Sequence, residues 1–202
     1  LNLIGARAFR DCNSLKQISL PSTISSLGVG AFYSSAIERL EIPELQTTIA
    51  DSLCYGCKSL QSIKVSSKTT IVGKCSFSVC IKLEHLTLPD KVSSIGESAF
   101  SDCDTLTYIT IPDSVSHIKE CAFYGCTNLT SVIIPENVTR IESGAFQMCT
   151  RLSSIKLPSG IVHFGEYMFS TLQIKINVPK GKKEEYCKLG LEPYRACIYE
   201  TQ

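Results

Sequence analysis

The sequence predicts an α/β repeat solenoid, a right-handed superhelix with a parallel sheet on one face, built from about eight repeats, each of roughly 22–23 residues. Two residue types that recur along the chain, phenylalanine and proline, support this prediction. Repeats of this length bury their apolar faces only against their neighbours, so the chain must grow as a stack. A phenylalanine recurs every 23 residues, at Phe77, Phe100, Phe123, Phe146 and Phe169. A proline closes the units at Pro21, Pro43, Pro89, Pro112, Pro135, Pro158 and Pro179.

Each unit begins with a segment that we expect to form a short helical turn. Ile95, Ala99 and Cys103 lie four residues apart, which places them on one face of a helix. Gly96 follows the aliphatic residue before this turn, where glycine suits a bend or a positive φ. Other glycines of this slot are Gly5, Gly28, Gly73 and Gly165, whereas Ala50, Lys119 and Glu142 occupy it in the remaining units. Positive φ is therefore not obligatory there.

The second part of each unit is predicted to be a β-strand. Ile109 and Ile111 alternate with polar neighbours, as in a strand that is buried on one side. Pro112 ends the strand because it has no N–H to donate. Stacked strands rise about 4.8 Å per repeat, so eight units would form a rod of about 40 Å.

The composition excludes several classes of protein. Twenty basic and 19 acidic residues leave a net charge of +1, which argues against binding to nucleic acid or to anionic membranes. The sequence contains no run of 18 apolar residues, so it predicts no transmembrane segment. The chain carries no His-Glu-x-x-His motif, nucleophile elbow or glycine-rich phosphate loop. We therefore expect no catalysis, no cofactor and no metal.

The 11 cysteines admit two interpretations. Equivalent residues in stacked repeats lie about 4.8 Å apart with parallel Cβ vectors, whereas a disulfide needs Cβ atoms about 3.8 Å apart. A column of small buried thiols is thus favoured over a disulfide or metal ladder. Cys54-x-x-Cys57 lacks the second pair of a structural zinc site, and Cys75 and Cys121 lie too far apart to bond. The column comprises Cys12, Cys57, Cys80, Cys103, Cys126 and Cys149.

Two surface patterns are candidate binding sites. His117, Arg140 and His163 share one repeat position and would form a basic column, which is either an anion site or a solvated polar edge. The outward positions of the predicted strands form a neutral, hydroxyl-rich face. Aromatic and arginine side chains are the usual anchors of interfaces, while an isolated exposed Ile133 needs no explanation. We predict that the binding residues of this face are Arg39, Lys64, His85 and Tyr108.

The string I-G-x-x-A-F-x-x-C-x-x-L-x-x-I-x-L-P covers residues 4–179 and resembles the BspA-like leucine-rich-repeat family. Three units depart from it, with Ser35 for cysteine in the second, Cys54 for phenylalanine and Ser66 for proline in the third, and Leu172 for cysteine in the last. The resemblance implies a solenoid domain over residues 1–179 and a cap over 180–202. The cap would hold a short helix around Glu184–Tyr186 and a final strand near Ala196–Tyr199. Cys187 and Cys197 are the disulfide candidates within it.

The resemblance also implies a cell-surface or secreted protein that binds a host or neighbouring-cell protein or glycan. We expect a monomer with a signal or anchor upstream of Leu1. Asn128-Leu-Thr130 and Asn137-Val-Thr139 are glycosylation sequons that matter only in a secreted eukaryotic protein. The alternatives are an intracellular interaction scaffold, in which reduced cysteines are stable, a structural spacer, or the targeting arm of an enzyme whose catalytic domain precedes Leu1.

Overall fold

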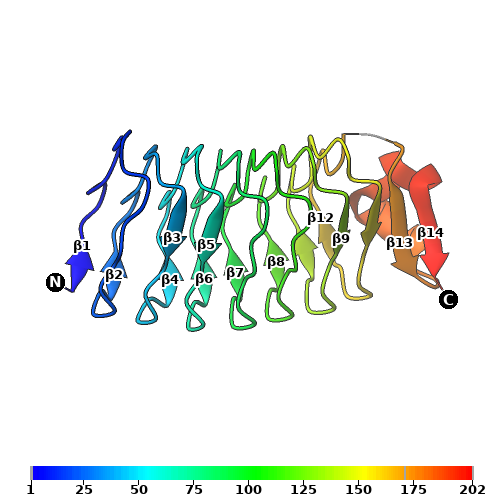
Figure 1. Cartoon of the computed structure of the whole chain (residues 1–202). Coiled ribbons are helices and arrows are strands. Elements are labelled where there is room, and N and C mark those ends of the chain that lie inside the picture. Colours follow the sequence, from blue (N-terminus) through cyan, green and yellow to red (C-terminus); the bar gives the residue numbers. More distant parts are fainter. Residues whose placement is uncertain (1, 171, 202) are drawn as a thin grey trace.

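The fold is a solenoid of short parallel strands. A computed structural model describes residues 2–170 and 172–201. Successive turns lie side by side along one axis, and the C-terminal elements cover the far end (Figure 1). The predicted repeat solenoid is confirmed, with two differences in its elements. Strands occupy two faces of the solenoid instead of one, and the predicted helical turn is absent from the described repeats.

The first strand row holds one two-residue strand per turn. Strands of neighbouring turns pair in parallel, except between the second and third turns, where the row divides into two sheets. Arg140 thus faces both His117 and His163, and Ile141 faces both Ile118 and Phe164. The inner residue of each pair is buried and the outer one faces solvent. The row comprises β1 (Leu3–Ile4), β2 (Ser26–Leu27), β4 (Thr48–Ile49), β6 (Ile71–Val72), β7 (Ser94–Ile95), β8 (His117–Ile118), β10 (Arg140–Ile141) and β12 (His163–Phe164).

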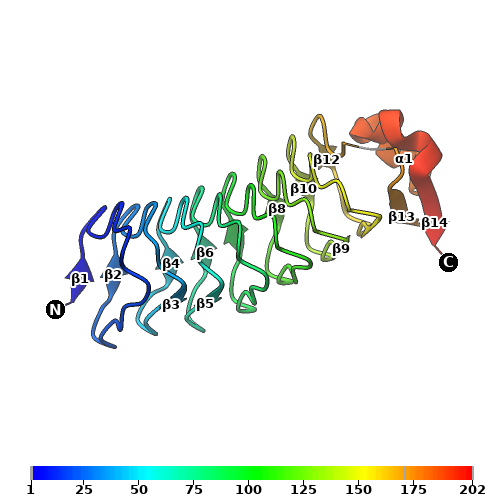
Figure 2. The ribbon, with the colours of Figure 1, turned by 45° about the horizontal axis from the view of Figure 1, so that its top comes forward.

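The second strand row lies on another face of the solenoid, and the turned view shows the two rows apart (Figure 2). It is interrupted: β3 pairs only with β5 in regular strand form, and β9, β11, β13 and β14 form a separate sheet. Between them, a single bridge joins Thr87 to Thr110. The predicted strand at Ile109 and Ile111 is thus reduced to this bridge, although both side chains are buried as expected. The row comprises β3 (Arg39–Glu41), β5 (Ser62–Lys64), β9 (Ser131–Ile133), β11 (Ser154–Lys156), β13 (Lys175–Pro179) and β14 (Ile198–Thr201).

The segment predicted to be helical is a chain of tight turns with left-handed residues. In the fifth repeat, Ser98 and Asp102 have φ of 52° and 56°. The N–H groups of Ser98, Phe100 and Asp102 donate to backbone carbonyls of the next turn at 2.7–2.9 Å. Those of Ala99, Ser101 and Cys103 donate to the carbonyl three residues earlier at 3.1–3.4 Å. Alternate donors thus bind the next turn, which a helix, with its internal hydrogen bonds, would prevent.

Glycine is required before this segment because a Cβ atom would not fit there, and not because the backbone has a positive φ. Gly96 lies outside the positive-φ region, and a Cβ added to it would lie 2.6 Å from the Lys74 backbone nitrogen in the preceding turn. That distance is far below a normal contact. The left-handed residues come two and six positions later, where most are not glycine.

The core is a stack of phenylalanine rings. Phe77, Phe100, Phe123 and Phe146 are 0% exposed, and adjacent ring centroids lie 5.5 Å apart with nearly parallel planes. Cys54 fills the same position in the third repeat and is also fully buried. The regular ring spacing shows that each turn sits directly on the previous one.

Five of the six predicted column cysteines are buried free thiols, namely Cys57, Cys80, Cys103, Cys126 and Cys149, and they form the cysteine column of the structure. The sixth, Cys12, is partly exposed and lies outside this column. The column thiols also act as hydrogen-bond donors. Each Sγ donates to the backbone carbonyl of the phenylalanine position one turn earlier, at 2.9–3.2 Å. Ser35 occupies the column in the second repeat and contacts the Cys57 Sγ at 3.6 Å. The thiol proton therefore satisfies a carbonyl that is buried between two turns.

The C-terminal segment closes the last turn. β13 pairs with β14, and between them lie α1 (Lys183–Tyr186), a π-helical turn (Cys187–Leu191) and a 3₁₀ helix (Glu192–Cys197). Tyr186 donates its hydroxyl proton to the Pro158 carbonyl, and Tyr194 donates to the Phe169 carbonyl at 2.9 Å. α1 overlaps the helix expected around Glu184–Tyr186, whereas the final strand begins at Ile198, because the expected strand residues Ala196 and Cys197 belong to the 3₁₀ helix. Tyr194, in the 3₁₀ helix, packs edge-on against Phe169 at the end of the ring stack, and Tyr186, in α1, packs edge-on against Phe164 of the first strand row.

We expect Phe100→Ala to lower the free energy of unfolding by about 3–5 kcal/mol, because it opens a cavity inside the ring stack. Urea unfolding followed by circular dichroism measures the change. Ile133→Ala removes a side chain that is 69% exposed and should change stability by less than about 0.5 kcal/mol. A loss below about 1 kcal/mol for Phe100→Ala would contradict the stacked core.

Stability should also fall at alkaline pH. Burial raises the pKa of Cys80, Cys103 and Cys126 well above the ordinary value and that of Cys149 to about 12. Above about pH 8.5 the unfolded chain loses thiol protons that the folded chain keeps, so stability is full below that pH and declines above it. The decline approaches about 1.4 kcal/mol per pH unit for each thiol. Urea unfolding between pH 8 and 10 tests this. Cys103→Ser should reduce the slope of the decline by the contribution of one thiol, up to about 1.4 kcal/mol per pH unit.

Candidate binding face

The four predicted binding residues all lie on the outer side of the second strand row, but they fall into two groups. Arg39 begins β3 opposite Ser62, and Lys64 ends β5 opposite Glu41. Lys64 and Glu41 form an ion pair, which raises the pKa of Lys64 through their hydrogen bond. Their side chains are 69% and 67% exposed, so the pair contributes little stability. Arg39 and Lys64 line one shallow groove with β3 and β5.

His85 and Tyr108 form the second group. Their ring centroids lie 5.7 Å apart with a 41° tilt, so the structure brings together two residues that the sequence placed one repeat apart. Tyr108 is 53% exposed. The Thr87–Thr110 bridge lies beside this pair and holds the two turns in register. One face of the aromatic pair is therefore open to a partner.

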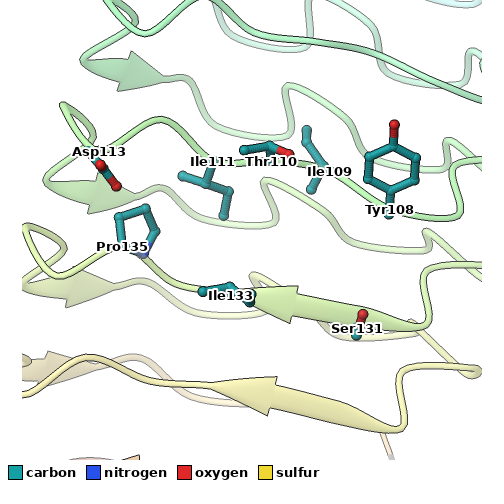
Figure 3. Close-up of a pocket in the computed structure, with 8 residues that line it drawn as sticks. All are labelled: Tyr108, Ile109, Thr110, Ile111, Asp113, Ser131, Ile133 and Pro135. Atoms are coloured by element: carbon teal, nitrogen blue, oxygen red, sulfur yellow. The ribbon is translucent and has the colours of Figure 1, made fainter.

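A groove of about 320 Å³ begins at Tyr108 (Figure 3). Tyr108 and Ser131 lie at one end, and Asp113 and Pro135 lie at the other. Ile133, which is 69% exposed, lies between them on β9. The groove is lined by Tyr108, Ile109, Thr110, Ile111, Asp113, Ser131, Ile133 and Pro135.

The groove follows from the interruption of the second strand row. Among the described residues, one backbone hydrogen bond joins 107–112 to 130–135, from the Thr130 N–H to the Thr107 carbonyl at 3.2 Å. The next turns pair fully, with Ile133 opposite Lys156. Sequence reasoning treated Ile133 as an isolated exposed residue and missed this groove. Both repeats match the repeat pattern, so no signal in the sequence marks the missing pairing.

The groove has the chemistry of a binding site. Its walls combine isoleucine and tyrosine side chains with the hydroxyls of Thr110 and Ser131 and the carboxylate of Asp113. Such a mixture of apolar surface and a few polar groups is typical of recognition surfaces. Within residues 2–170 and 172–201, no group of three or more His, Cys, Asp or Glu side chains is arranged to hold a metal ion.

The basic column on the first strand row is partly neutralised. His117, Arg140 and His163 are adjacent, as the repeat predicts. Glu142 contacts both the Arg140 Nε at 3.1 Å and the His163 Nε2 at 3.3 Å. The Ser116 hydroxyl lies 3.0 Å from the His117 Nδ1. These partners favour the polar-edge interpretation over an anion site.

The two sequon asparagines hold successive turns together. Asn128 and Asn137 each donate a side-chain amide hydrogen to a backbone carbonyl 24 residues earlier, at 2.7 Å. Asn128 also accepts a hydrogen bond from Arg151 at 2.8 Å. Both amides are thus engaged in the folded chain.

Cys187 and Cys197 are free and buried in the cap. The Cys197 Sγ donates to the Leu172 carbonyl at 2.9 Å, as the cysteine column does in the repeats. A disulfide between Cys187 and Cys197 stays a prediction.

A membrane-crossing helix is absent from the described part of the chain, where no helix has the required length and apolar character.

A sequence profile of the BspA type leucine rich repeat region matches six copies over residues 1–91 and 70–184. Comparison with curated proteins finds no significant match.

The fold is found in other solved structures, of which two are compared with this chain. A leucine rich cell surface protein from Faecalibacterium prausnitzii is 22% identical and has a TM-score of 0.66, with the alignment covering 94% of this chain. The pneumococcal vaccine antigen PcpA is 15% identical and has a TM-score of 0.58, with the alignment covering 100% of this chain. The chain spans 60% of the length of each of these structures.

Proposed function

Because the chain belongs to the BspA-type leucine-rich-repeat family, we propose that it is a non-catalytic recognition module of a cell-surface or secreted protein. It binds a protein or glycan through the outer side of the second strand row. The similarity in fold to a bacterial cell surface protein supports the location. The role rests on the binding face and not on that similarity.

The observation that carries this proposal is the groove between Tyr108 and Ile133. Two large apolar side chains, 53% and 69% exposed, flank one concave site near the middle of the second strand row. Exposed aromatic residues in such positions supply most of the energy of many interfaces. His85 packs against Tyr108 and limits the freedom of its ring, so less entropy is lost on binding.

Charged side chains lie on both sides of this apolar centre. Arg39 and Lys64 lie toward the N-terminal end, and Lys156 and Lys175 lie on β11 and β13 toward the C-terminal end. A polar rim around an apolar centre is the usual organisation of a protein interface. In this arrangement the groove provides affinity, and the flanking charges, which include the Lys64–Glu41 ion pair, orient the partner.

A second candidate function is an intracellular interaction scaffold. The observation that favours it is the set of 11 free cysteines, which are stable in a reducing compartment. This candidate uses the same binding face and differs in location. Fractionation of cells that express the full-length protein separates the two.

We expect Tyr108→Ala to weaken binding at least about tenfold, the loss typical of a hot-spot residue. Arrays of extracellular-matrix proteins and glycans, probed with the purified chain, identify a ligand, and calorimetry measures its affinity. Ile71→Ala is the matched control, since it truncates a 42% exposed side chain on the first strand row. Unchanged affinity in Tyr108→Ala, or equal losses in both variants, would refute this face.

A further inference from the structure

The cysteine column links assembly of the solenoid to the redox state of its thiols. We infer that these five thiols must be reduced for the turns to stack, and that the assembled solenoid then shields them from oxidation. This inference goes beyond the proposed function and does not depend on it. The column is a redox-sensitive device in the fold.

The thiol proton of each column cysteine joins two turns. Each Sγ donates to a backbone carbonyl of the preceding turn at 2.9–3.2 Å, so one bond of the column joins each pair of successive turns from the second to the seventh. A buried carbonyl that loses its donor is destabilising. A disulfide sulfur carries no proton. Oxidation of a column cysteine therefore removes the donor at the place where two turns meet.

The space around the column sulfurs is too small for an added group. Four of the five side chains are 0% exposed and Cys149 is 3% exposed, within an interior that contains the ring stack. Protein interiors are close-packed and leave no space for an added group. A glutathionyl group on any of these sulfurs would therefore hold two turns apart. A chain modified in this way cannot form the continuous core.

Folding protects the column thiols from oxidation. In exchange with oxidised glutathione, a protein thiolate attacks one sulfur, forms a mixed disulfide and releases one glutathione thiolate. The reaction needs a deprotonated and accessible sulfur. Burial raises the pKa of Cys80, Cys103, Cys126 and Cys149 and removes access. At Cys57 the hydrogen bond from Cys54 lowers the pKa, but its side chain is also fully buried.

Cys75 and Cys121 provide an internal control in the same molecule. They lie in the left-handed turns, their side chains are partly exposed, and they are not part of the column. No hydrogen bond from their Sγ to a carbonyl of the preceding turn is found among the described residues. A modification there should leave stacking intact.

The experiment treats the urea-unfolded full chain with limiting oxidised glutathione, so that molecules carry about one adduct each. Urea is then removed, folded and unfolded fractions are separated by size exclusion, and adducts are mapped by mass spectrometry. We expect column adducts to be depleted at least tenfold in the folded fraction, and adducts at Cys75 and Cys121 to occur in both fractions. Equal column occupancy in both fractions would overturn the inference.

A second measurement needs no refolding. The native chain is treated with a thiol-reactive dye, with and without urea. The column cysteines should remain unlabelled in the native chain for at least ten times longer than Cys75 and Cys121, and all should react in urea. Labelling of the column at the rate of Cys75 would overturn the shielding.

Discussion

The structure depends on one constraint, which is that alternate backbone N–H groups of each turn bond to the next turn. Ser98, Phe100 and Asp102 donate forward to the next turn, while the residues between them donate within their own turn. Equivalent residues must then lie directly over one another. The ring stack at 5.5 Å spacing, the thiol column and the two strand rows all follow from this register. No single repeat could satisfy these bonds alone, so the stability of each turn depends on its neighbours.

The candidate site lies where this constraint is relaxed. Close pairing is kept along the ring stack, where Phe100 and Phe123 lie 5.5 Å apart, but is lost across the second strand row between 107–112 and 130–135. The same two turns are thus closely stacked on one side and open on the other. Ile133 and Tyr108 are exposed at this opening, and the surrounding turns hold them in place. A rigid solenoid can therefore carry a local groove without an inserted loop.

Residue spacing predicted the period and the inward residues, because burial follows directly from periodic apolar positions, whereas the cap was expected from the family resemblance. Residue spacing failed at the turn segment. Ile95, Ala99 and Cys103 lie four apart, which fits a helix, and the left-handed residues Ser98 and Asp102 carry no glycine to signal the true backbone. On the second strand row it selected His85 and Tyr108, which the structure places side by side, but it missed the groove. Strand pairing between two matching repeats depends on backbone geometry that side-chain patterns do not encode.

The chemistry of the inter-turn donors bears on the two candidate functions. Near solvent the columns use hydroxyls: Ser93 donates to the Thr70 carbonyl and Thr70 to the Thr47 carbonyl, at 3.3 and 3.1 Å. In the core the donor is a thiol, as in Cys103. A buried hydroxyl costs more to desolvate than a thiol, which behaves as a small apolar group with a weak donor. Cysteine is thus explained by its place in the core, and its abundance alone does not indicate a reducing compartment. This weakens the main argument for the scaffold and leaves the exposed face to decide the function.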